Sequence, residues 1–245
     1  MAKARPILPN APIADVTCEL RFHGDLGLFA AWAGVQHDLR DQFPQMLVPG
    51  AVVGTSPLLQ HVQLANQQNS RAVLLSINSF AYETREYAGY DKYREDLLRI
   101  ASTFLKHAPP LRFTRFGLRY INVLPEFEPS GPSIHPALKL SLAGWNLAGG
   151  TLVEQPTMGV LVRLPQNLTL RVSVYQGEVT PPPVALPIVR SLSRLAGPVL
   201  DFDIASSEGL DKPKALEAFL TAGHDVLDDV FFELVTPAYY NSMKG

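Results

Sequence analysis

Residues 14–22 alternate strictly between apolar and polar side chains, and no other feature constrains the fold of this chain as much. The apolar members are Ala14, Val16, Cys18, Leu20 and Phe22, and the polar members are Asp15, Thr17, Glu19 and Arg21. Side chains two residues apart in a strand share a face. The pattern therefore predicts a half-buried strand with one apolar face and one charged face.

Three other segments carry apolar residues at spacings of three and four, which is typical of amphipathic helices. The first covers residues 28–43 and ends before Pro44, and the second covers residues 93–104 and is stopped by the prolines at 109–110. Proline cannot continue a helix because it lacks a backbone N–H and its ring clashes with the preceding turn.

The third helical segment covers residues 216–234. Asp211 is placed to cap its start, Pro213 fits the first turn, and Pro237 is expected to end it. Further strands are expected from alternation and from β-branched or aromatic content. They cover residues 71–85, 111–124, 158–164, 168–175 and 199–204, with a three-residue hairpin loop at 165–167.

Strands spaced as hairpins and mixed with three long helices, without regular strand–helix alternation, predict an α+β fold. We expect a mainly antiparallel sheet packed against about three long helices, in a single unit spanning residues 1–245. Residues 1–11 are expected to form a loosely ordered N-terminal arm.

The composition is that of an ordinary globular protein, with 47% hydrophobic and 18% charged residues among 245. No apolar run approaches the roughly 18 residues that a membrane-spanning helix needs, so no membrane association is expected. Cys18 is the single cysteine, which excludes an internal disulfide. The first residues lack the apolar stretch of a secretory signal, and a cytoplasmic location is expected.

Three runs of sequence carry a resemblance to a known family. They are residues 12–22 (PIADVTCELRF), 115–122 (RFGLRYIN) and 200–204 (LDFDI), with a looser match over 220–243. The chain resembles a sporadically distributed family of uncharacterised bacterial proteins with a Leu-Arg-Tyr-Ile-Asn core. The resemblance implies one unit of full family length and no assigned reaction. The patchy distribution suggests, by analogy, a mobile defence or toxin–antitoxin cassette.

Arg115 and Arg119 fall on one face of the strand expected at residues 111–124, opposite an apolar face that includes Tyr120. Two guanidiniums about 13 Å apart along a strand can each bind a phosphate or carboxylate. One interpretation is therefore a nucleic-acid or anion groove. The other is that both arginines pair with acidic residues of the protein itself, either Asp201 and Asp203 or those of the last helix.

Asp201 and Asp203 share the outer face of a strand, and two carboxylates at this spacing can bind Mg²⁺. Alternation on a solvated strand gives the same pattern. His224 and Asp228 are four residues apart on the last expected helix, where a general base and its orienting carboxylate could lie. A half-buried histidine held by Asp228 is the alternative. Cys18 is expected in the core.

The phosphate-binding loop, the dinucleotide fingerprint, the serine-hydrolase elbow and the His-Glu-x-x-His motif are all absent from the sequence. Residues 200–245 carry nine acids and three bases, which indicates an acidic surface.

We therefore expect a non-enzymatic interaction or regulatory protein without a cofactor, whose first candidate partner is another protein. Candidate binding residues are Arg115, Arg119, Tyr120, His224 and Asp228. The alternatives are a metal-dependent hydrolase or nuclease using Asp201 and Asp203, and a nucleic-acid-binding protein using Arg115 and Arg119. A second copy of the chain is a further candidate partner.

Overall fold

A computed structural model describes residues 8, 10–48, 61–124, 139, 158–178, 196–207 and 215–244. Within them, nine strands form one antiparallel sheet, and three of the helices are long. This confirms the expected α+β class. The expected N-cap at Asp211 and Pro213, and most of the expected arm at residues 1–11, lie outside the described residues.

The sheet runs in the order β2-β3-β4-β5-β1-β6-β9-β8-β7, with every neighbouring pair antiparallel. The strands are β1 (Ile13–Phe22), β2 (Gln45–Leu47), β3 (Val62–Ala65), β4 (Arg71–Leu75), β5 (Ser79–Thr84), β6 (Phe113–Val123), β7 (Met158–Leu164), β8 (Leu168–Glu178) and β9 (Ala196–Ser206). The helices are α1 (Leu28–Leu39), α2 (Tyr90–His107), α4 (Ala215–Leu234) and α5 (Pro237–Ser242).

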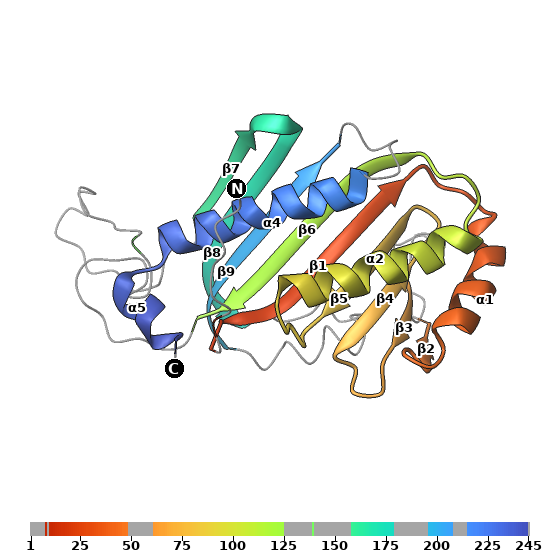
Figure 1. The fold of residues 1–245 in the computed structure, drawn as a ribbon, viewed down its shortest axis with the longest axis horizontal. Coiled ribbons are helices and arrows are strands. Elements are labelled where there is room, and N and C mark those ends of the chain that lie inside the picture. Colours follow the sequence, from red (N-terminus) through yellow and green to blue (C-terminus); the bar gives the residue numbers. More distant parts are fainter. Residues whose placement is uncertain are drawn as a thin grey trace.

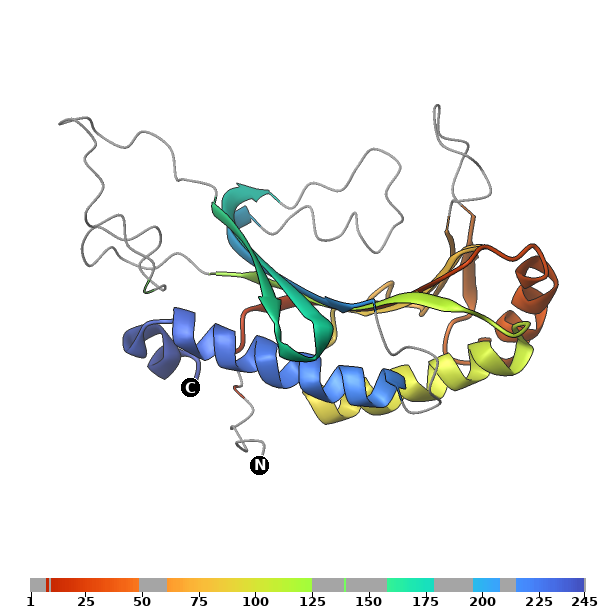
Figure 2. The same ribbon diagram turned by 90° about the horizontal axis from the view of Figure 1, so that it is seen from above.

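The long helices α2 and α4 lie along the same face of the sheet, and α1 packs near one end of α2 (Figures 1 and 2). Alternate residues of β1, β6 and β9 point into this layer and are buried. Gly223 lets α4 approach the sheet closely, because a Cβ there would lie 3.2 Å from Cγ2 of Ile204. We call this side of the sheet the core face and the other side the polar face.

Three local expectations differ from the structure. The first expected helix, over residues 28–43, ends at Leu39. Residues 71–85 form two strands rather than one, because Ser76 turns the chain: its hydroxyl oxygen accepts from the N–H of Asn78 (3.3 Å) and of Ser79 (3.0 Å). Pro237 begins α5 in addition to following α4. Thr236 caps α5 by accepting from the N–H of Tyr239, and proline is favourable in a first helical turn because no N–H is needed there.

Candidate functional site

The polar face of the central strands gathers the charged residues that alternation places there. Strand pairing sets Arg119 of β6 opposite Thr17 of β1 on one side and Asp203 of β9 on the other. The next row along these strands contains Asp15, Ile121 and Asp201. Acids and arginines from three strands thus come within reach of one another.

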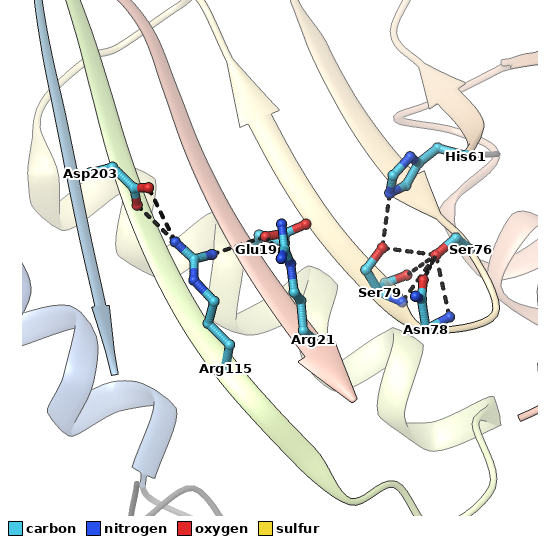
Figure 3. Close-up of polar contacts among 8 residues, drawn as sticks. All are labelled: Glu19, Arg21, His61, Ser76, Asn78, Ser79, Arg115 and Asp203. Atoms are coloured by element: carbon cyan, nitrogen blue, oxygen red, sulfur yellow. Dashed lines mark hydrogen bonds and ion pairs between the residues drawn. The ribbon is translucent and has the colours of Figure 1, made fainter. Parts of the chain in front are cut away.

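Arg115 joins two acids across the sheet. Its Nη1 donates to Oε2 of Glu19 at 3.0 Å, and its Nη2 donates to both carboxylate oxygens of Asp203 at 2.9 and 3.2 Å (Figure 3). Glu19 also accepts from Nε of Arg21 at 2.8 Å. Charge-assisted bonds of this kind are stronger than neutral ones, so they fix the Arg115 guanidinium between β1 and β9.

Gly117 makes this position of Arg115 available. A Cβ built on Gly117 would lie only 2.3 Å from Nη1 of Arg115, so the guanidinium occupies the space that a side chain would fill. The glycine in the run Arg-Phe-Gly-Leu-Arg therefore has a steric role.

Arg119 forms a separate, bidentate pair. Its Nε and Nη2 donate to the two oxygens of Asp201 at 2.8 and 2.7 Å. These hydrogen bonds raise the pKa of Arg119 above its usual value. The Arg119 side chain remains 47% exposed and that of Asp201 only 14%. Mutual pairing, one of the two interpretations that the sequence left open, describes the contacts of both arginines.

Two carboxyl groups of the polar face are buried. Asp15 Oδ2 accepts from the hydroxyl of Thr17 at 2.8 Å, while Asp15 Oδ1 is buried with no hydrogen-bond partner. Burial raises the pKa of Asp15 to about 6. Glu83 lies opposite Thr17, and burial, together with the nearby Asp15, raises its pKa to about 8. The sequence did not single out Glu83, because a charge inside a predicted strand is usually solvated.

Tyr120 and His224 do come together, but on the core face, on the other side of the sheet from Arg115 and Arg119. The Tyr120 hydroxyl lies 3.4 Å from Nδ1 of His224 and 3.4 Å from the hydroxyl of Tyr87. The His224 ring stacks on Tyr90 with centroids 3.8 Å apart. Asp228 is half-buried one helical turn farther along α4. The five candidate binding residues therefore form two groups on opposite faces.

A serine–histidine contact that the sequence did not indicate lies at the turn between β4 and β5. His61 Nε2 is 2.8 Å from the hydroxyl of Ser79, which is 2.8 Å from that of Ser76 (Figure 3). Ser76 donates in turn to Oδ1 of Asn78 at 2.8 Å. Burial lowers the pKa of His61 and favours its neutral form. Both serines are buried, so these contacts stabilise the turn.

The two candidate metal ligands pair with arginines. Asp201 and Asp203 bind different arginines, and within the described ranges no three His, Cys, Asp or Glu side chains are grouped as metal ligands. Cys18 is buried, as expected, and burial raises the pKa of its thiol. The low thiolate fraction makes it a poor nucleophile.

The strand β7 lies at one edge of the sheet and exposes apolar side chains. Val160 is 44%, Leu161 66% and Val162 37% exposed. Among the described strands, β7 pairs with β8 alone. A long apolar edge is unusual, since unpaired N–H and C=O groups there can bind a further strand. No sequence expectation pointed to this edge as a site.

No family model and no curated protein matches this chain. Among solved structures, it is similar to "Methanococcus jannaschii TBP" over 87% of this chain and 97% of that chain, at 10% identity and a TM-score of 0.25. A TM-score this low assigns neither a shared fold nor a shared function. Across the described helices, none is both long and apolar enough to cross a bilayer.

Proposed function

We propose that this protein is a non-enzymatic binding protein whose partner is a protein that adds a strand to the edge of β7. The observation that carries the proposal is the exposure of Val160, Leu161 and Val162 on an edge strand. Strand addition supplies main-chain hydrogen bonds for affinity and side-chain contacts for specificity.

The contacts of the polar face support binding over catalysis. A divalent metal at Asp201 and Asp203 would have to displace the guanidiniums of Arg119 and Arg115 from both carboxylates. A phosphate would meet guanidiniums whose charge is already compensated by Glu19, Asp203 and Asp201, and would bring its own negative charge beside these carboxylates. The metal exchange breaks charge-assisted hydrogen bonds and the phosphate adds like-charge repulsion, so the hydrolase and nucleic-acid alternatives are less favoured by this geometry.

The proposal is tested with two lysine variants of matched exposure. Leu161 on β7 is 66% exposed and Leu26, in the turn before α1, is 65% exposed. The full chain, Leu161→Lys and Leu26→Lys are each immobilised and used to capture protein, both from an extract of the native host and from a solution of the purified chain itself.

Bound protein is measured at equilibrium without a washing step, with the purified chain supplied at about 100 μM. The full chain and Leu26→Lys should bind a stoichiometric protein, and Leu161→Lys should bind about tenfold less tightly, because one lost interface anchor typically costs more than about 1 kcal/mol. Equal capture by the two lysine variants, or no stoichiometric capture in either arm, would contradict the proposal.

A further inference from the structure

We infer that the strand added to β7 is β7 of a second copy of this chain. The two copies would then share one continuous antiparallel sheet about a twofold axis at Leu161. The inference rests on the proposed function, because it uses the same edge and names its partner.

The two edges of the sheet differ in length. The edge strand β2 has three residues, whereas all seven residues of β7 pair with β8 without a bulge. Natural proteins blunt their edges with short strands, prolines, charges or bulges. Within β7 the only such feature is Arg163, so β7 is the edge suited to pairing.

Both faces of β7 offer apolar contact. Val160 and Val162 lie opposite Val172 and Leu170 of β8, which are buried on the core face. Leu161 points to the polar face, opposite Arg171. A further strand at this edge would cover Val160 and Val162 on one side and Leu161 on the other, and burial of that apolar surface favours association.

The strand is nearly self-complementary about Leu161, which is what a twofold interface requires. In an antiparallel pair centred there, Leu161 faces its own copy, Val160 faces Val162, and Met158 faces Leu164. Each of these three kinds of cross-strand pair is apolar, and such pairs stabilise sheets.

Charge disfavours one alternative register, the pair centred on Arg163. In the pair centred on Leu161, Arg163 faces Gly159 of the other copy, and the two Arg163 residues lie about 14 Å apart along the strands. A slipped pair centred on Arg163 would set two guanidiniums directly opposite each other, which is unfavourable.

The expected dimer is weak. An interface made by seven strand residues from each copy buries less surface than the roughly 1,200 Å² of a stable interface. We therefore expect a dissociation constant on the order of 10 μM, within the range of transient complexes.

Cysteine cross-linking tests the register. Directly opposed residues have Cα atoms about 4.5–5.5 Å apart, within the range of a disulfide, whereas residues offset along the strand are too far apart. Single Leu161→Cys, Val160→Cys, Val162→Cys and Leu26→Cys variants are oxidised with copper phenanthroline. Cys18 is buried and does not compete.

Leu161→Cys should form a covalent dimer at least about tenfold faster than Val160→Cys, Val162→Cys or Leu26→Cys alone, since only its thiols are directly opposed. A mixture of Val160→Cys and Val162→Cys should cross-link faster than either variant alone. Equal rates for all variants would overturn the register.

Sedimentation of the full chain separates this inference from the proposed function. The chain should dimerise with rising concentration, and Leu161→Lys should remain monomeric because two lysines would face each other. A full chain that stays monomeric up to about 200 μM, well above the expected constant, overturns the inference. So does a Leu161→Lys variant that dimerises equally. The proposed function survives either result if capture from the host extract still depends on Leu161, and falls if it does not.

Discussion

Gly117 determines where the guanidinium of Arg115 can lie. Because it has no side chain, the guanidinium folds back over β6 and reaches Glu19 and Asp203 at once. Alternation in the sequence places all of these residues on one face. It cannot tell which arginine binds which acid, because that depends on the neighbours of β6 in the sheet and on a free space beside Arg115.

Replacing Gly117 with Ala should destabilise the protein by about 1 kcal/mol, as Arg115 loses charge-assisted hydrogen bonds to make room for the methyl group. Gly159→Ala is the control, because the nearest atom to its Cβ would be 4.0 Å away. Urea denaturation measures both. In an Arg115→Ala background the cost of Gly117→Ala should vanish, and an unchanged cost there would contradict the steric role.

Glu83 should make stability depend on pH. Burial raises its pKa in the folded protein to about 8, above the ordinary value of 4.5. The folded state therefore favours the protonated form of Glu83. The contribution of this group to the free energy of unfolding is fully present below pH 4.5 and is lost as pH rises through 8.

At pH 8.5, the free energy of unfolding of Glu83→Gln, measured by urea denaturation, should therefore exceed that of the unsubstituted chain by more than about 1 kcal/mol. At pH 5 the two free energies should differ little. Glu95→Gln, an exposed residue of α2, is the control. A difference between Glu83→Gln and the full chain that is the same at both pH values would show that Glu83 does not titrate in this range.

At the scale of elements, long periodic segments were predictable and short ones were not. The hairpin of β7 and β8 with its loop at Pro165–Asn167 follows the expected bounds closely. The strands β2 and β3 have three and four residues, too few to show alternation. They are strands because they pair with neighbours, which local sequence does not encode.

The packing of α4 on the sheet depends on Gly223. Gly223→Val should cost about 2–3 kcal/mol, because a Cβ already lies 3.2 Å from Ile204 and 3.7 Å from Leu118. Ala218→Val on the exposed side of α4 is the control and should cost only about 0.5 kcal/mol, from helix propensity. Thermal unfolding compares them, and similar losses would mean that the close approach is not tight.

At the scale of the whole molecule, the sheet separates two kinds of surface. The core face packs under α2 and α4, while the polar face holds the ion pairs of Arg115 and Arg119. The sequence predicted this separation from alternation alone. Alternation also placed Tyr120 opposite the two arginines. It could not predict that His224 lies beside Tyr120 on that side, because this requires α4 to be placed over β6.

The three-residue β2 limits how far such an assembly can grow. Joining two molecules through β7 consumes the one long edge of each, and the outer margins of the product are then two short β2 strands. Among the described strands, neither margin offers a template of useful length for a third molecule. Association through β7 therefore stops at the dimer, and raising the protein concentration should not produce fibres.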